Sequence, residues 1–242
     1  VSPSEVTVVT GVPNMGKSEW MDALMINMIQ SYGWRFGIFS AENFPVEHHL
    51  LKLVGKFSGK AFWGEDKLDE ETARGSMKIL NDHIKFIGTQ EDSVTVESIM
   101  EQAKVLNYTI EHKYGDGENE TLYISRVLSQ LSSFSKVNEL HIWLVAHPRK
   151  MENGVDRKPV VPTPYDISGS ANWFNKCDNA ITVHRHKSEE DDYAGIHVHK
   201  IRFQYKNGKP NQGQPAKLKY NLTNGRYYEY FEQEQFKENL FG

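Results

Sequence analysis

The sequence holds a single cysteine, Cys177, among 242 residues. One cysteine excludes a disulfide framework and a zinc site built from several cysteines, and it favours a reducing compartment. No apolar run approaches the roughly 18 residues that a membrane-spanning helix needs, so we expect no contact with a membrane. The N-terminus has neither a methionine nor a signal peptide. We therefore expect this chain to be the C-terminal part of a longer protein.

The composition is that of an ordinary globular protein, with 38% hydrophobic and 25% charged residues. The net charge of -4 argues only weakly against a nucleic-acid partner, because a local basic segment can bind phosphates whatever the total charge is. Residues 196–220 form such a segment. They contain no acid and six basic residues, namely Lys200, Arg202, Lys206, Lys209, Lys217 and Lys219.

Strand-like and helix-like patterns alternate in the first 150 residues. We expect strands over 5–10, 35–40, 84–88 and 140–146, and helices over 17–31, 46–58, 70–82, 94–106 and 119–137. Residues 148–170 are expected to form a long loop, and further strands over 179–186, 195–205, 216–221 and 226–230 follow it. This order predicts one α/β domain over residues 1–242: a mostly parallel sheet flanked by helices and extended by late antiparallel strands, with a flexible tail over 231–242.

A phosphate-binding motif lies between the first strand and the first helix. The stretch GVPNMGKS, residues 11–18, satisfies G-x-x-x-x-G-K-[ST] in full. Glycines let backbone N–H groups curl around phosphate oxygens, the lysine reaches the β- and γ-phosphates, and the serine hydroxyl binds Mg²⁺. The predicted nucleotide-binding residues are Gly11, Val12, Pro13, Asn14, Met15, Gly16, Lys17, Ser18 and Glu19. The alternative, a glycine turn with a surface lysine, does not explain why the motif is complete.

Two further candidates follow predicted strands. Glu42 stands just past the strand at 35–40, and His147 follows the strand at 140–146. Open α/β sheets bind ligands at the carboxyl ends of their strands. A carboxylate there can polarise an attacking water, and a histidine can contact the γ-phosphate. From spacing alone, an exposed loop acid and a structural histidine are equally acceptable interpretations.

Taken together and in this order, these motifs resemble the RecA-type ATPase domain of the DnaB-like replicative helicases, and most of all the branch that contains Twinkle and the phage primase–helicases. The resemblance spans nearly the whole chain. It rests on GVPNMGKSEW (11–20), IFSAEN (38–43), TLYISRVLSQL (121–131), WLVAHPRKM (143–151), YDISGSANWFNKCDNAITV (165–183) and VHKIRF (198–203).

The resemblance implies a role for each matching residue. Lys17 and Ser18 hold the nucleotide (ATP or another NTP) and its Mg²⁺, Glu42 is the catalytic glutamate, and His147 senses the γ-phosphate. Lys200 and Arg202 match a K-x-R pair that reaches the nucleotide of the neighbouring subunit in a ring hexamer, which would make hydrolysis depend on assembly. The alternative for this pair is the polar face of a strand.

The resemblance also implies a grip on single-stranded DNA by loops that line the hole of the ring. Basic side chains, small residues and backbone N–H groups would hold the strand without reading its sequence. Trp173 and Phe174 could stack on bases, but we favour core packing for both. The predicted DNA-binding residues are Arg149, Lys150, Arg157, Lys158, Ser168, Gly169, Ser170, Asn172 and Lys176.

One expected element has no counterpart in the sequence. The family places a hydrophobic strand ending in a Mg²⁺-positioning aspartate where this chain passes from Leu106 to Asn107, and "NYTIEH" resembles the text that normally follows that strand. A deletion there would leave a hole in the sheet. We therefore hypothesise that about 10–15 residues are missing from the sequence at this point. A Cα distance of about 3.8 Å between Leu106 and Asn107, within an intact sheet, would contradict this hypothesis.

Other functions remain open at the level of the sequence. The main prediction is an NTP-driven hexameric DNA helicase, of cytoplasmic bacterial or phage origin or from a mitochondrial nucleoid, with a primase module before Val1. The alternatives are a RecA-like recombination filament, a signalling or clock-type ATPase, and a non-catalytic binding module. His184, His186, His197 and His199 alternate along two late strands and allow a metal site, although polar strand faces explain them as well.

Overall fold

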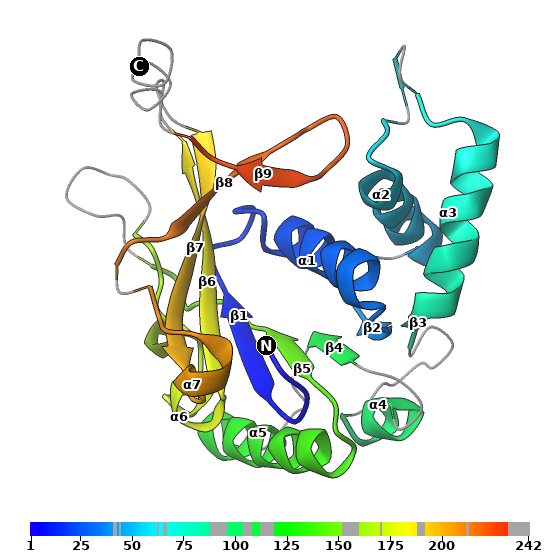
Figure 1. Ribbon diagram of the computed structural model, residues 1–242. Helices are drawn as coiled ribbons and strands as arrows, with labels where there is room; N and C mark the ends of the chain where they lie inside the picture. Colours follow the sequence, from blue (N-terminus) through cyan, green and yellow to red (C-terminus); the bar gives the residue numbers. More distant parts are fainter. Residues whose placement is uncertain are drawn as a thin grey trace.

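The computed structural model describes residues 1–40, 43, 45–61, 63–64, 67–87, 96–103, 108–111, 119–151, 160–169, 171–187, 192–211 and 213–231. Helices and strands alternate in the first part of the chain, and strands dominate the last part (Figure 1). The elements are β1 (Val6–Thr10), α1 (Lys17–Tyr32), β2 (Phe36–Phe39), α2 (Val46–Ser58), α3 (Glu70–His83), β3 (Ile84–Phe86), α4 (Val96–Ala103), β4 (Tyr108–Glu111), α5 (Glu120–Val137), β5 (Ile142–Val145), η1 (Pro164–Asp166), α6 (Asn172–Lys176), β6 (Asn179–Lys187), β7 (Asp192–Ile201), α7 (Gln204–Asn207), β8 (Ala216–Tyr220) and β9 (Tyr227–Glu229).

Within the described residues, nine strands form one sheet in the order β3-β2-β4-β5-β1-β6-β7-β8-β9. Pairing is parallel from β3 to β6 and antiparallel from β6 to β9. Because β1 lies in the middle of the parallel part, the loop that follows it opens at the carboxyl edge of the sheet. The predicted fold class is confirmed.

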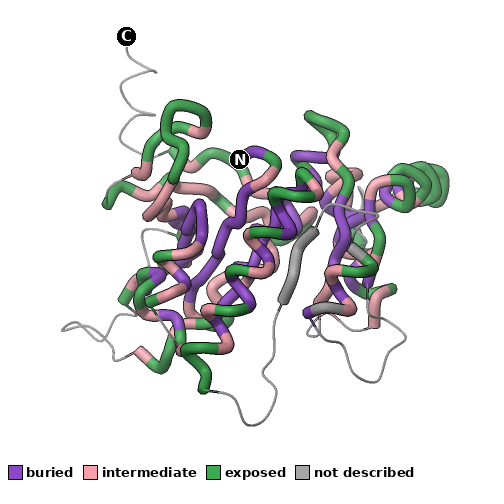
Figure 2. Tube along the Cα trace, turned by 90° about the horizontal axis from the view of Figure 1, so that it is seen from below, coloured by how far each residue is buried: buried purple, intermediate pink, exposed green. Residues whose placement is uncertain are grey.

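Helices cover both faces of the parallel part (Figure 1). Side chains of α1, α2 and α3 pack with Phe36, Ile38 and Trp143 on one face. Side chains of α4, α5 and α6 pack with Ile142 and Leu144 on the other. Neighbouring residues of β5 therefore enter different cores, as the alternation of side chains along a strand requires. Figure 2 shows the buried residues gathered in the sheet and on the inner sides of the helices.

The strand β4 corrects the sequence analysis, which expects no strand between residues 106 and 119. Residues 108–110 pair in parallel with β2, and residues 108–111 pair in parallel with β5. Tyrosine, threonine and isoleucine all favour strands, and two neighbouring strands supply both ladders. The sheet is thus continuous, and the argument from a hole in the core no longer supports a missing segment. Leu106 and Asn107 themselves lie outside the described residues.

Two further differences concern the later part of the chain. The strand expected over 195–205 ends at Ile201, and residues 204–207 form the short helix α7 instead. The loop expected over 148–170 contains the 3-10 turn η1, where Thr163 and Asp166 cap each other. The predicted tail lies outside the described residues beyond Phe231. In the described part of the chain, no helix combines the length and the apolar character that crossing a bilayer demands.

Candidate functional site

The loop between β1 and α1 turns through three residues with positive φ angles, Gly11 (154°), Asn14 (63°) and Gly16 (85°). A Cβ on Gly11 would lie 2.2 Å from the carbonyl oxygen of Val183, so the close approach of the loop to β6 requires glycine. Gly16 precedes α1 and offers its N-terminus no side-chain cap. A glycine-rich loop leading into an uncapped helix N-terminus is the arrangement that binds phosphate groups.

The structure brings together two of the predicted residues, Lys17 and His147. The Lys17 side chain is buried, and its Nζ donates a hydrogen bond to the Gly11 carbonyl oxygen at 3.0 Å. The same Nζ lies 3.5 Å from Nδ1 of His147, which follows the carboxyl end of β5. Both side chains therefore meet at the edge of the sheet where the loop opens.

A cavity of about 480 Å³ lies over this loop. One wall is the predicted motif together with His147. The other wall comes from the antiparallel strands, and the sequence analysis did not predict it as part of the site. A signal was present, because aromatic and charged residues alternate in "KLKY" and "RYYEY". The residues of this second wall are Arg185, Asp192, Tyr193, Ala194, Lys219, Tyr220 and Tyr227.

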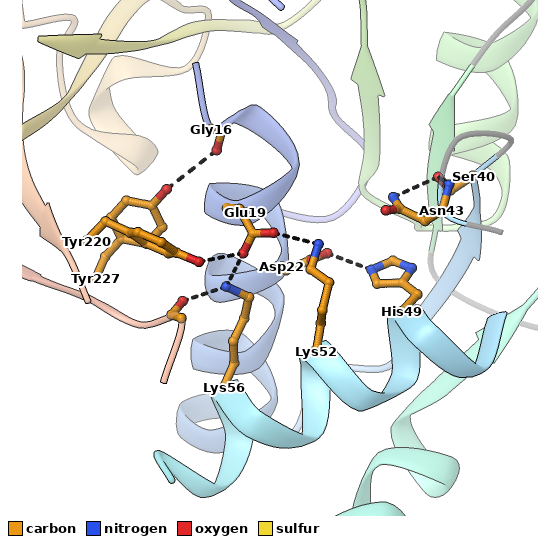
Figure 3. Close-up of polar contacts among 11 residues, drawn as sticks. Gly16, Glu19, Asp22, Ser40, Asn43, His49, Lys52, Lys56, Tyr220 and Tyr227 are labelled. Atoms are coloured by element: carbon orange, nitrogen blue, oxygen red, sulfur yellow. Dashed lines mark hydrogen bonds and ion pairs between the residues drawn. The ribbon is translucent and has the colours of Figure 1, made fainter. Parts of the chain in front are cut away.

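Glu19 links the two walls (Figure 3). Its Oε2 accepts hydrogen bonds from Lys56 Nζ at 2.6 Å and from the Tyr220 hydroxyl at 3.0 Å, while Oε1 pairs with Lys52 Nζ at 2.6 Å. Burial alone would raise the pKa of Glu19, but the hydrogen bonds and charges of Lys52 and Lys56 outweigh it and lower the pKa to about 2. Glu19 lines the cavity as predicted, although its carboxylate is already held by two lysines.

The hairpin β8–β9 is anchored to the C-terminus of α2. Lys56 Nζ also donates to the Gly225 carbonyl oxygen at 2.5 Å, and the Arg226 guanidinium donates to the carbonyl oxygens of Lys56 and Phe57, both at 2.6 Å. These contacts fix the tyrosine wall relative to α1. Burial, followed by the nearby charge of Glu19, raises the pKa of both Tyr220 and Tyr227, so both hydroxyls stay neutral.

Lys200 and Arg202 lie far from the phosphate loop of their own chain. Asp178 accepts a hydrogen bond from Arg202 Nη1 at 2.7 Å and another from the backbone N–H of Val6, the first residue of β1. The loop begins after the other end of this five-residue strand, a separation of about 17 Å at 3.3 Å per residue. Lys200 Nζ donates to the carbonyl oxygens of Phe174 and Cys177 at 2.5 and 2.8 Å, at the C-terminus of α6.

The predicted DNA-binding residues have different surroundings. Arg149, Lys150 and Ser168 are exposed, and Asn172 is half-buried. Gly169 packs against α5, where a Cβ would lie 2.3 Å from Ile124 Cδ1. Lys176 Nζ is held by α5 through Ser125 and Ser129. Trp173 is buried in the core, as favoured from the sequence. Arg157, Lys158 and Ser170 lie outside the described residues, and so does Glu42.

The four histidines share one face of β6 and β7. The ring centroids of His184 and His186 are 4.8 Å apart, and those of His186 and His197 are 6.2 Å apart. Burial lowers the pKa of His184 and His197 to about 4, so both are neutral at pH 7. Within the described ranges, no group of three or more His, Cys, Asp or Glu side chains is arranged to hold a metal ion.

Comparison with known proteins gives a consistent result. No family model matches the chain. The "Twinkle homolog protein, chloroplastic/mitochondrial" of Arabidopsis thaliana is 37% identical over 250 residues, which cover 94% of this chain. This confirms the resemblance to Twinkle. The chain spans only about a third (34%) of that relative's length. The aligned stretch is also longer than this chain, so it includes residues of the relative that have no counterpart here.

Solved structures confirm the fold. An ATPase domain whose structure was solved separately superposes with a TM-score of 0.75 at 13% identity and covers 96% of this chain and 86% of that one. A DnaB-like replicative helicase, described together with its interactions with primase, superposes with a TM-score of 0.74 at 13% identity, over 95% of this chain and 60% of that one. The chain has the RecA-like fold of DnaB-like ATPase domains.

Proposed function

We propose that this chain is the NTP-hydrolysing motor part of a replicative DNA helicase of the Twinkle type. The observation that carries the proposal is the contact between Lys17 and His147 beneath a glycine-rich loop, at the carboxyl edge of a RecA-like sheet. The similarity to Twinkle supports the same function.

The residues of the cavity divide the work between them. The loop N–H groups and Lys17 would bind the phosphates, and Lys17 would leave the Gly11 carbonyl oxygen to do so. Tyr220 and Tyr227, whose ring centroids are 4.9 Å apart, would form the wall for the base. Mg²⁺ would neutralise phosphate charge, and the Ser18 hydroxyl is a hard oxygen donor of the kind it prefers. Glu42 stays the predicted base by resemblance.

Assembly into a ring would bring a second chain to the site. Lys200 and Arg202 lie at the amino end of β1, about 17 Å from their own phosphate loop, which is compatible with action on the nucleotide of a neighbouring subunit. Arg202 is 41% exposed in its ion pair with Asp178, so a partner's phosphate could reach it. We expect a homo-oligomer, a ring hexamer by resemblance.

The loop after β5 is the proposed contact with single-stranded DNA. Arg149 and Lys150 are exposed there, and their charges would hold phosphates without selecting a base sequence. Lys176 contributes less, because its Nζ serves α5. A primase module in the longer chain stays a prediction. The compartment named for the Arabidopsis relative supports an organelle over the cytoplasm.

The decisive experiment measures NTP hydrolysis and unwinding of a forked DNA by the full-length protein. We expect single-stranded DNA to stimulate hydrolysis, and Lys17→Ala to abolish it. Lys78→Ala removes an exposed lysine of α3 and is the matched control, with activity unchanged. Full activity in Lys17→Ala would refute the assignment of the loop, and hydrolysis without DNA stimulation would favour a signalling ATPase.

Mixed oligomers test the trans arrangement. Subunits with Arg202→Ala and subunits with Lys17→Ala are each expected to be inactive alone. If Arg202 acts on a neighbour's nucleotide, mixing the two regains part of the activity, because some interfaces then hold an intact loop and an intact arginine. No recovery would show that Arg202 acts only within its own chain. Electron microscopy separates a closed ring from a recombination-type filament.

A further inference from the structure

Asp22 is a buried carboxylate one helical turn after Ser18 on α1. Its exposed fraction is 3%. Residues four apart lie on the same face of a helix, and side chains tilt toward the N-terminus. The carboxylate of Asp22 therefore reaches back toward Ser18. Both residues line one small cavity of about 30 Å³.

One oxygen of Asp22 is already used and the other is not. Oδ1 accepts a hydrogen bond from Nε2 of His49, on α2, at 2.8 Å. Oδ2 lies 3.3 Å from Lys52 Nζ, yet it accepts no hydrogen bond from any described residue. A buried carboxylate oxygen is costly to leave without a donor. Figure 3 shows His49 and Lys52 holding Asp22 from α2.

The small cavity lies directly behind the predicted magnesium ligand. Ser18 lines both this cavity and the large one above the phosphate loop. The remaining lining comes from α1, α2 and the carboxyl ends of β2 and β5, including Ser40 and Asn43. A space of this size accommodates one water molecule, with polar groups on several sides.

The other acids of the nucleotide cavity are engaged elsewhere. Glu19 is held by Lys52, Lys56 and the Tyr220 hydroxyl. Asp192 forms a two-pronged ion pair with Arg185 at 2.6 and 2.8 Å. Among the described acids that line the two cavities, Asp22 is thus the one with a carboxylate oxygen that accepts no hydrogen bond.

We infer that Asp22 supplies the carboxylate of the magnesium site, through a water molecule held in the small cavity between its Oδ2 and the Ser18 side of the ion. Mg²⁺ usually keeps several waters and takes one or two carboxylates, so an indirect contact suits it. The inference rests on the proposed function, because it presumes that a nucleotide and Mg²⁺ bind at the loop. It places the acid on α1, where the family expects an aspartate on a strand.

The test measures binding of a fluorescent, non-hydrolysable ATP analogue to the full-length protein during a Mg²⁺ titration, with and without EDTA. Asp22→Asn keeps the acceptor for His49 and removes the charge. We expect it to raise the Mg²⁺ concentration for half-maximal enhancement at least tenfold, with binding in EDTA unchanged. The matched control is Asp82→Asn, at an exposed position on α3, which should change nothing.

Two further variants separate this role from a purely structural one. His49→Gln weakens the α1–α2 contact but keeps the carboxylate, so it should lower the thermal midpoint and shift the Mg²⁺ requirement less than threefold. If Asp22→Asn folds poorly, the double variant Asp22→Asn/Lys52→Met removes the lysine left without its partner, and the same Mg²⁺ shift is expected.

An unchanged Mg²⁺ requirement in Asp22→Asn, beside a wild type that needs Mg²⁺, would overturn this inference alone. The same holds if Glu111→Gln, at the carboxyl end of β4, raises the requirement while Asp22→Asn does not. A wild type that binds no nucleotide would overturn the proposed function as well, and Lys17→Ala gives the baseline for that case.

Discussion

Replacing Lys56 by methionine tests the link between the phosphate loop and the tyrosine wall. Lys56 is 2% exposed, and its ammonium group serves Glu19 on α1 and the Gly225 carbonyl oxygen in the hairpin β8–β9. Methionine has a similar length and fills the same space, but it donates no hydrogen bond. The substitution therefore leaves a carbonyl oxygen without this donor and a carboxylate with one lysine fewer.

The expected loss of unfolding free energy is about 3 kcal/mol. An unpaired buried acceptor costs about 1–3 kcal/mol, and breaking a buried ion pair from one side costs about 3–5 kcal/mol. Glu19 keeps Lys52 and Tyr220, and its side chain is 30% exposed, so the lower part of the combined range applies. For a domain of this size, that loss lowers the thermal midpoint by about 6–12 °C.

Urea and thermal unfolding of Lys56→Met, Glu19→Gln and the double variant provide the assay. We expect a coupling energy of about 1–3 kcal/mol between the two positions, and weaker nucleotide binding in Lys56→Met because Tyr220 and Tyr227 lose their support. Lys60→Met is the control, since its ion pair with Asp69 is exposed on both sides and contributes little. A loss below about 1 kcal/mol, or strict additivity, would refute the reasoning.

Three other predictions concern separate features. Gly11→Ala should abolish nucleotide binding and lower the thermal midpoint, because its Cβ would lie 2.2 Å from the Val183 carbonyl oxygen; normal binding would contradict this. The pKa of Glu19 falls from 4.5 to about 2 on folding, so its stabilisation is complete above pH 4.5 and is lost as the pH falls toward 2. The difference in unfolding free energy between wild type and Glu19→Gln should shrink over that window, and a constant difference would count against it. Trp173→Ala should cost about 3–5 kcal/mol in urea unfolding, because the indole is buried and donates to the Ser168 carbonyl oxygen at 3.0 Å; a small loss would favour an exposed, DNA-stacking role.

The phosphate loop and its flanking elements follow closely from the sequence. The helix expected over 17–31 ends one residue later, at Tyr32, and that expected over 46–58 has the same bounds as α2. These elements are predictable because glycine spacing, helix periodicity and strand composition are local properties. His147 was also found, since it follows a strong apolar strand.

The elements that the sequence missed depend on partners far away in the chain. Residues 108–111 are too short to stand out as a strand, and β2 and β5 supply the hydrogen bonds that make them one. The tyrosine wall becomes part of the site only because Lys56 and Arg226 join the hairpin to α2. No local pattern encodes these contacts.

The sequence by itself determined the class of fold and the phosphate loop, because backbone curvature and helix formation depend on neighbouring residues. Tertiary structure decided which side chains share the site. It set Lys17 against His147 across 130 positions of the chain, and it placed Arg202 at the opposite end of β1 from the phosphate loop. It also buried Asp22 behind Ser18. Such groupings depend on how the sheet orders its strands and which helix covers each face, and packing of the whole chain fixes both.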